Sequence, residues 1–224
     1  MTQADRWLAA TWPVVHRALP DPPARVVELG CGTLGGHVPM LRAAGYDALG
    51  VDPEAPEGAE YRQVEFERLD DPPTEVAAVV ASTSLHHVED PAEVLDGVVR
   101  ALAPGGRVVV LEWDWEAFDR PTAEWCFRRL EPDDEHGWLH HHRDAWADSG
   151  VSWDEYLRGW AQEHGIHPAR ELLRLLDERL RLDAPVWAPY FFADLPETSE
   201  EDEERAIRVG RIRATRVEVV GRRP

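Results

Sequence analysis

Short apolar runs alternate with helical patterns through the first half of the chain. Five apolar runs predict strands, at residues 25–29, 48–51, 61–66, 76–82 and 107–111. Two segments between them have helical periodicity, residues 36–44 and residues 91–102. Strands that alternate with helices in this way are typical of βαβ units, so the sequence predicts an α/β fold built on a parallel sheet.

The predicted helix at residues 91–102 has a complete start signal. Asp90 can cap it, Pro91 occupies its first position, and Glu93 stands where a capping box requires an acid. Pro104, which two glycines follow, ends the helix and turns the chain into the fifth strand.

The pattern changes after the fifth predicted strand. Residues 113–165 are rich in aromatic and charged side chains and contain no strand-like run, so we expect a helical insertion or lid. Four leucines at helical spacing then predict one further helix: Leu172, Leu173, Leu176 and Leu180. Final strands are predicted at residues 181–192 and 215–221, with an acidic helix at residues 199–209 between them. The carboxylates that open this helix favour its dipole.

At 224 residues the chain has the length of one domain. We expect four parts within it: a helical cap at residues 1–24, a core at residues 25–112, the insertion at residues 113–170, and C-terminal helices and strands at residues 171–224 that complete the sheet.

Charge and composition narrow the class of function. The formal net charge is −19, which repels phosphate backbones and anionic lipid, so neither nucleic acid nor a membrane surface is an expected partner. The chain contains no lysine, which excludes Schiff-base and P-loop mechanisms. Cys31 and Cys126 lie far apart and predict no disulfide framework or metal cluster. Without a secretory signal or a long apolar run, the sequence predicts a cytoplasmic protein.

A glycine-rich turn directly follows the first predicted strand, in the order Glu28-Leu-Gly-Cys-Gly-Thr-Leu-Gly-Gly. Glycines let the backbone approach a ligand where a Cβ atom would collide. Asp52 follows the second strand, where its carboxylate can accept hydrogen bonds from both hydroxyls of a ribose, worth about 1.5–3 kcal/mol. Strand, glycine turn and acid together indicate a nucleoside cofactor.

Two cofactors remain possible at this turn. Gly30, Gly32 and Gly35 have the G-x-G-x-x-G spacing of dinucleotide-binding proteins. Glu28, however, precedes the first glycine by two positions and could face a positively charged amino group, which a methionine moiety has and a dinucleotide lacks.

Four segments in order resemble the motifs of class I S-adenosylmethionine-dependent methyltransferases, in the branch that acts on small molecules. They are Glu28-Leu-Gly-Cys-Gly-Thr, Val51-Asp52-Pro53, Ser84-Leu85-His86-His87-Val88 and Leu102-Ala-Pro-Gly-Gly-Arg-Val-Val-Val. The resemblance covers about residues 25–113. It implies a Rossmann-like, seven-stranded, mostly parallel sheet flanked by helices, with one antiparallel strand and a helical insertion between strands five and six. It also implies S-adenosylmethionine as the cofactor.

The resemblance assigns roles to individual residues. Glu28, Gly30, Cys31 and Gly32 would hold the methionine end, Asp52 with Pro53 the ribose, Glu65 and Phe66 the adenine edge, and Ser82 the region of the sulfonium.

The sequence departs from the family pattern in three places. The third glycine of the first motif is replaced by Leu34, and we infer a one-residue insertion that Gly35 accommodates. The acid common at the start of strand four is replaced near Ala77. Glu65 and Glu67 are both available for the adenine, and alternation along a strand would point them to the same face.

Histidines and tryptophans supply the remaining candidates. His86 and His87 follow strand four, where one could act as a base in methyl transfer or, alternatively, orient the loop. The run His140–His142, with His136 nearby, could suggest a metal site, but adjacent helical residues point in different directions, which favours a surface or lid role.

Seven of the ten tryptophans lie between Trp113 and Trp160. Large rings at helical spacings favour a core role, whereas Trp113 and Trp115, directly after strand five, are expected at the rim of the site. Trp7 and Trp12 could form part of a lid or pack a helix on the sheet edge.

No Asn-Pro-Pro-Tyr or Asp-Pro-Pro-Tyr segment follows strand four, which disfavours methylation of nucleobase or glutamine amino groups. We therefore expect a methyltransferase that acts on a small molecule, as a monomer or homodimer. The alternatives are a nicotinamide-dependent oxidoreductase and a non-catalytic protein that retains the fold.

Overall fold

A computed structural model describes residues 2–131 and 137–224. The strands are β1 (Arg25–Leu29), β2 (Asp47–Val51), β3 (Tyr61–Arg62), β4 (Val76–Ser82), β5 (Leu102–Trp113), β6 (Arg181–Leu182), β7 (Val186–Ala188) and β8 (Arg216–Arg222). The helices are α1 (Gln3–Ala18), α2 (Val38–Ala43), α3 (Pro91–Ala101), α4 (Arg120–Phe127), α5 (Trp138–Ser149), α6 (Trp153–Glu163), α7 (Ala169–Asp177) and α8 (Glu200–Arg208).

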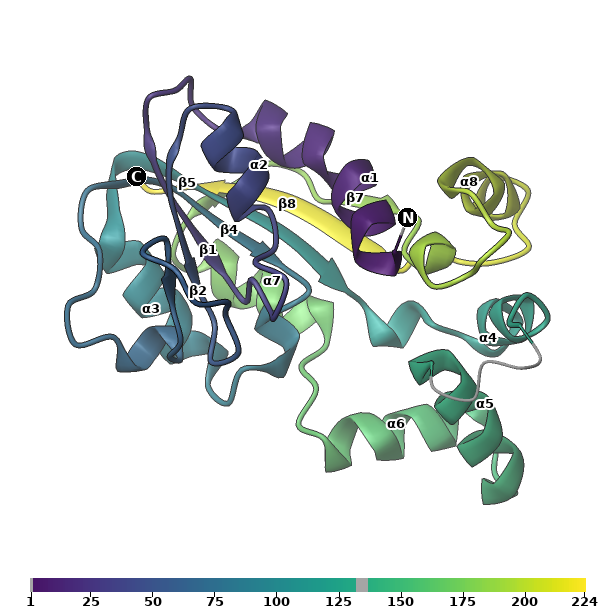
Figure 1. The fold of residues 1–224 in the computed structure, drawn as a ribbon. Helices are drawn as coiled ribbons and strands as arrows, with labels where there is room; N and C mark the ends of the chain where they lie inside the picture. The colour runs from purple at the N-terminus through teal and green to yellow at the C-terminus, as the bar shows by residue number, and fades with distance from the viewer. Residues whose placement is uncertain (1, 132–136) are drawn as a thin grey trace.

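One mixed sheet organises the chain, in the order β3-β2-β1-β4-β5-β8-β6 (Figure 1). The strands from β3 to β5 are parallel, and β8 runs antiparallel to β5. The predicted α/β class and mostly parallel sheet are therefore confirmed. The order places β1 between β2 and β4, so the carboxyl ends of these three strands meet at one edge.

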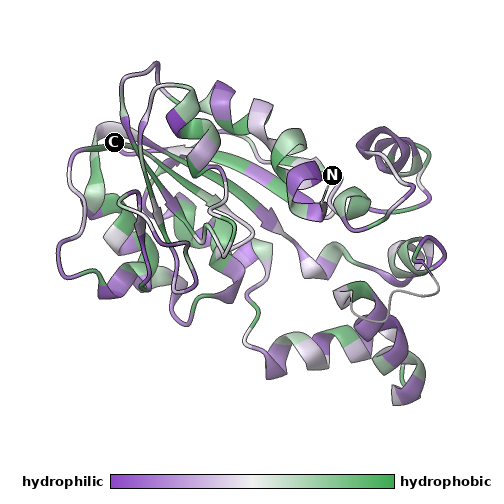
Figure 2. Cartoon of the chain, viewed as in Figure 1, coloured by the Kyte–Doolittle hydropathy of each residue, from purple (hydrophilic) through white to green (hydrophobic). Residues whose placement is uncertain are grey.

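Helices cover both faces of the sheet (Figure 1). Strand residues alternate between the two faces. Val26, Val80 and Val109 pack with α1 and α2, whereas Val27 and Val79 pack with α3 and α7. Figure 2 shows the hydrophobic colour concentrated along the strands, as expected for a sheet buried on both sides.

The sheet has eight strands rather than seven, because the predicted strand at residues 181–192 is broken. Two short strands, β6 and β7, both pair with β8. Pro185 separates them and Pro189 ends the second, since proline has no N–H for the ladder and restricts the residue before it. Beyond Pro189 the chain forms a 3-10 turn, Phe191–Ala193.

The predicted third strand is also shorter than expected. Only Tyr61 and Arg62 pair with β2, opposite Gly50 and Val51, where β2 ends. With no partner strand beyond that point, the chain continues to a 3-10 turn, Phe66–Arg68. The argument that strand alternation points Glu65 and Glu67 to one face is therefore wrong, because neither residue lies in a strand.

The start of α3 has the predicted Asp90 cap and first-turn proline but no capping box. The Asp90 carboxylate accepts the N–H groups of Ala92 and Glu93 at 2.9 and 3.1 Å. Within the described residues, reciprocal capping boxes occur instead at the N-termini of α1 and α8. The strand after α3 begins at Leu102, immediately after the helix, rather than at residue 107.

Helices α4, α5 and α6 form the expected insertion after β5 (Figure 1). They bury an aromatic core of their own, which we call the insertion cluster; its largest members include Trp113, Phe118, Trp125, Trp153 and Phe191. No described helix is long and apolar enough to cross a membrane.

Candidate active site

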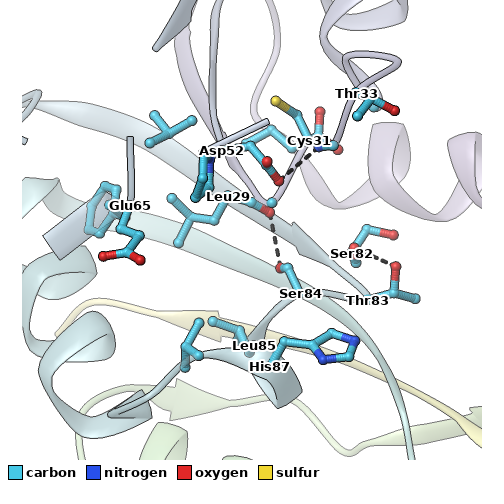
Figure 3. Close-up of a pocket in the computed structure, with 18 of the residues that line it drawn as sticks. Leu29, Cys31, Thr33, Asp52, Glu65, Ser82, Thr83, Ser84, Leu85 and His87 are labelled. Carbon is cyan, nitrogen blue, oxygen red and sulfur yellow. Dashed lines mark hydrogen bonds between the residues drawn. The ribbon is translucent and has the colours of Figure 1, made fainter. Parts of the chain in front are cut away.

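A cavity of about 640 Å³ lies at the carboxyl ends of β1, β2 and β4. It is bounded by the loops that follow these strands (Figure 3). Helix α1 bounds another side. Ligands of α/β proteins bind at this edge of the sheet, and the volume lies within the roughly 300–1,000 Å³ of small-molecule sites. Most of the residues predicted to hold the cofactor line it: Glu28, Gly30, Cys31, Gly32, Asp52, Pro53, Glu65, Phe66 and Ser82.

The two leading glycines of the turn serve different purposes. Both have positive φ angles, 70° at Gly30 and 61° at Gly32. A Cβ atom on Gly30 would lie 2.1 Å from the Cβ atom of Ser84, so this glycine allows two loops to touch. A Cβ atom on Gly32 would meet no protein atom within 4 Å. The backbone at Gly32 is therefore open to the cavity.

Asp52 is fixed at the end of β2 by two backbone donors. Its Oδ2 accepts the N–H of Gly32 at 2.9 Å (Figure 3). Its Oδ1 accepts the N–H of Glu54 at 2.7 Å. Each oxygen keeps a second lone pair for a ligand hydroxyl. The carboxylate is thus oriented before any ligand arrives.

Cys31 is a packing residue of the turn. Burial raises the pKa of its thiol to about 12, and the nearby Glu28 and Asp52 carboxylates add to the rise. The thiol is therefore neutral at physiological pH and is a poor nucleophile.

Glu28 already has a partner within the protein, which the sequence analysis missed. Its Oε2 accepts the backbone N–H of His37 at 2.7 Å, and its Oε1 lies 3.0 Å from Nδ1 of the same histidine. Both side chains are buried. The inference that Glu28 requires a ligand amino group as its partner is therefore wrong. A polar residue next to a glycine turn was the available signal for His37.

Gly35 lies outside the cavity lining. Its φ is +81°, and a Cβ atom there would lie 2.3 Å from the hydroxyl of Tyr61. It therefore allows the turn to pack against β3. Gly36 lines the cavity instead. A Cβ atom at Gly36 would lie 2.5 Å from Oε1 of Glu28, so only glycine fits there.

The loop after β4 carries a strained residue. Thr83 lines the cavity with φ +53°, a conformation that β-branched residues rarely adopt. Glu112 on β5 holds the following residues, because its Oε1 accepts the N–H groups of Ser84 at 2.9 Å and Leu85 at 2.7 Å. Sequence analysis missed Glu112, whose role depends on the pairing of β4 with β5.

The two candidate histidines point to different surroundings. His86 is buried, bonds through Nδ1 to Oε2 of Glu112 at 2.5 Å, and does not line the cavity. His87 lines it (Figure 3). Desolvation and the neighbouring His86 lower the pKa of His87 to about 4, so its ring is neutral at physiological pH. His167 supports the same loop, since its backbone N–H donates to the carbonyl of His86 at 3.0 Å.

Helix α1 covers one side of the cavity with Ala4, Trp7 and Leu8. The indole Nε1 of Trp7 donates to Oγ of Ser82 at 3.1 Å. Trp12 lies elsewhere, stacked on His16 with ring centroids 4.9 Å apart. Of the two N-terminal tryptophans, Trp7 therefore belongs to the cover.

A family model described as a methyltransferase domain matches residues 4–179, which include the cover, the glycine turn and the loop after β4. The chain belongs to this methyltransferase family.

Solved structures share the fold of the methyltransferase at low sequence identity. An S-adenosylmethionine-dependent methyltransferase from Mesorhizobium loti is 19% identical, with a TM-score of 0.53, over 96% of this chain and 98% of that one. One from Methanosarcina mazei is 14% identical, with a TM-score of 0.56, over 94% and 97%. Geranyl diphosphate C-methyltransferase from Streptomyces coelicolor is 20% identical, with a TM-score of 0.56, over 96% and 78%. No curated protein matches the chain in sequence.

Family and fold favour S-adenosylmethionine over a nicotinamide dinucleotide as the cofactor of this enzyme. Neither an oxidoreductase nor a non-catalytic binding protein is favoured. The Gly30, Gly32 and Gly35 spacing is therefore not a dinucleotide fingerprint in this methyltransferase.

The residues that the sequence predicts for the adenine edge are one apolar side chain and two acidic ones. Phe66 is buried, whereas Glu65 and Glu67 line the cavity near it. Glu65 pairs with Arg68 at 2.6 Å, and its side chain is partly exposed.

Trp113 and Trp115 do not line the cavity, contrary to prediction. Trp113 is 3% exposed and stacks on Tyr190 with ring centroids 6.0 Å apart, inside the insertion cluster. The core role of these rings is the correct interpretation, because β5 extends two residues beyond its predicted end and carries Trp113 into the insertion.

The histidine run on α5 is partly buried rather than on the surface. His140 and His142 are buried, and Nδ1 of His142 lies 3.0 Å from the hydroxyl of Tyr156. His141 is exposed. No group of three or more metal-ligating side chains occurs within residues 2–131 and 137–224, and His136 lies outside them.

Proposed function

We propose that the protein transfers a methyl group from S-adenosylmethionine to a small-molecule acceptor in this cavity. The observation that carries the proposal is the pairing of Asp52 with the open backbone of Gly32 at the carboxyl ends of β1 and β2. The residues fit the cofactor, since a carboxylate suits a ribose diol and an open glycine backbone suits a polar tail.

Each part of the cavity has a proposed role. Gly30, Cys31 and Gly32 hold the methionine end through their backbone, with Glu28 behind them. Asp52 binds the ribose hydroxyls and Pro53 shapes the turn beside it. Glu65 and Phe66 flank the adenine, and Glu67 is the second carboxylate available there. Gly35 supports the turn from outside.

When bound, S-adenosylmethionine supplies a methyl group on a positively charged sulfur, which a nucleophile attacks in line. The protein therefore aligns the acceptor and excludes water. Trp7 and Ser82 close the side of the cavity next to α1. His87 is neutral and faces the cavity, so it can accept a hydrogen bond or a proton from an acceptor. His86 positions this loop through Glu112.

The charges of the cavity favour an uncharged or cationic acceptor. Five acidic side chains line it: Glu28, Asp52, Glu65, Glu67 and Glu89. Among the described residues, no arginine lines it. A phosphorylated acceptor would meet carboxylates and find no guanidinium partner. We further propose, from the sequence, that the protein is cytoplasmic and is a monomer or a homodimer.

Isothermal calorimetry with S-adenosylmethionine, S-adenosylhomocysteine and NADH tests the proposal, using the wild type and Asp52→Asn. We expect micromolar affinity for the two sulfur ligands, weakened about tenfold or more in the variant, which loses charge-assisted hydrogen bonds. Tighter binding of NADH, or equal affinity of both proteins for S-adenosylhomocysteine, would refute the assignment.

A further inference from the structure

His37 connects two parts of the cavity wall, the glycine turn and α1. It precedes α2, and its side chain is fully buried. On one side, its backbone N–H donates to Oε2 of Glu28 at 2.7 Å, and its Nδ1 lies 3.0 Å from Oε1 of the same carboxylate. On the other side its Nε2 lies 3.0 Å from Oγ1 of Thr11 in α1. The imidazole therefore bridges the glycine turn and the covering helix.

The two ring nitrogens of His37 have different partners. Nδ1 lies 3.0 Å from Oε1 of Glu28, and Nε2 lies 3.0 Å from Oγ1 of Thr11. The hydroxyl of Thr11 also lies 2.8 Å from the carbonyl of Trp7. His37 thus links the buried carboxylate of Glu28 to the backbone of α1 through a continuous series of hydrogen bonds.

The contact reaches the cavity through Trp7. This residue accepts the Thr11 hydroxyl at its carbonyl and donates from its indole to Ser82, while its ring lines the cavity. The space around Glu28 is closed as well, because a Cβ atom on Gly36 would lie 2.5 Å from the carboxylate. A shift of the glycine turn would therefore displace His37, and with it α1.

We propose that His37 is a positioning residue that couples the shape of the glycine turn to the closure of α1 over the cavity. Glu28 then acts on the methionine end through its hydrogen bonds to His37 and through the turn, and not as a free counter-ion for the cofactor. The assignment of the methionine end to this turn rests on the proposed function, whereas the coupling itself does not.

The first test needs no ligand. Amide hydrogen exchange is measured in the wild type, Thr11→Val and Thr11→Ser. The valine removes the contact with His37 at nearly constant volume, and the serine keeps the hydroxyl. We expect Thr11→Val to speed exchange of amides in residues 33–38 about 5- to 10-fold, equivalent to one buried hydrogen bond, and Thr11→Ser to stay within about twofold of the wild type. Unchanged exchange in this segment of Thr11→Val overturns the coupling, whether or not the cofactor binds.

The second test separates the two ends of the cofactor. Calorimetry compares S-adenosylhomocysteine with 5′-methylthioadenosine, which lacks the amino-acid part, on the wild type, Thr11→Val and His37→Gln. We expect both variants to bind S-adenosylhomocysteine about 5- to 10-fold more weakly and 5′-methylthioadenosine within about twofold of the wild type. Equal losses for both ligands would indicate general damage and overturn the positioning role. If His37→Gln does not fold, Thr11→Val and Thr11→Ser still decide. Failure of the wild type to bind either ligand refutes the proposed function and leaves the exchange test standing.

Discussion

Replacing Glu112 by glutamine probes the support of the loop after β4. The buried carboxylate has three donors around it: the N–H groups of Ser84 and Leu85 on one oxygen and the ring of His86 on the other. A carboxylate can accept all three, whereas an amide turns one of its two positions into a donor. Glu112→Gln keeps the volume of the side chain, so no cavity contributes to the effect.

The expected loss is that of one charge-assisted hydrogen bond, about 1.5–3 kcal/mol in the free energy of unfolding. For a chain of this size it corresponds to a fall of roughly 3–12 °C in Tm. Ser84 and Leu85 line the cavity, so we also expect weaker binding of S-adenosylhomocysteine. Urea titration at 25 °C and calorimetry measure the two effects.

Glu124→Gln is the matched control. Glu124 also accepts a charge-assisted bond, from Arg120 at 2.7 Å, but on the exposed side of α4. Surface pairs of this kind contribute about 0–1 kcal/mol. The reasoning fails if Glu112→Gln unfolds within about 0.5 kcal/mol of the wild type, or if the control loses as much stability as it does.

Three further changes test other parts of the structure. Thr83→Gly relieves a strained backbone conformation that costs about 1–3 kcal/mol. The glycine makes the unfolded chain more flexible, which costs only about 0.5–1 kcal/mol, so the urea midpoint should rise. A lower midpoint contradicts the strain. Gly30→Ala places a Cβ atom 2.1 Å from Ser84 and should lower Tm far more than Gly105→Ala, which has an equally positive φ but no atom within 4 Å; equal effects would show that the loops do not touch. Burial raises the pKa of Glu203 to about 7, so the folded protein binds a proton at this carboxyl more tightly than the unfolded chain does. The stability that the bound proton contributes is therefore lost as pH rises from about 4.5 to 7. Glu203→Gln should remove this part of the pH dependence of the urea midpoint, and parallel curves for the two proteins contradict it.

Local signals predicted the parts of the fold in which local sequence decides. The strands at residues 25–29 and 76–82 occur with the predicted bounds, since both are short, mostly apolar segments at the centre of a parallel sheet. Asp52 and the glycine turn lie together because the ends of adjacent parallel strands must meet.

The errors arose where partners distant in sequence decide the outcome. The strand expected at residues 61–66 ends early because its neighbour ends, and a run of residues cannot reveal that. Glu112 looks like any acid at a strand end until the pairing of β4 with β5 places three donors beside it. His37 likewise became a candidate only when α1 packed over the turn.

The position of α1 has a practical consequence for handling the protein. A peptide fused ahead of Met1 would join the chain three residues before Ala4, which lines the wall of the cavity. The other end of the chain leaves β8 at Arg222, opposite Arg107, at the edge of the sheet away from the cavity (Figure 1). An affinity tag or a fluorescent label therefore belongs at the C-terminus, where it leaves ligand entry unobstructed.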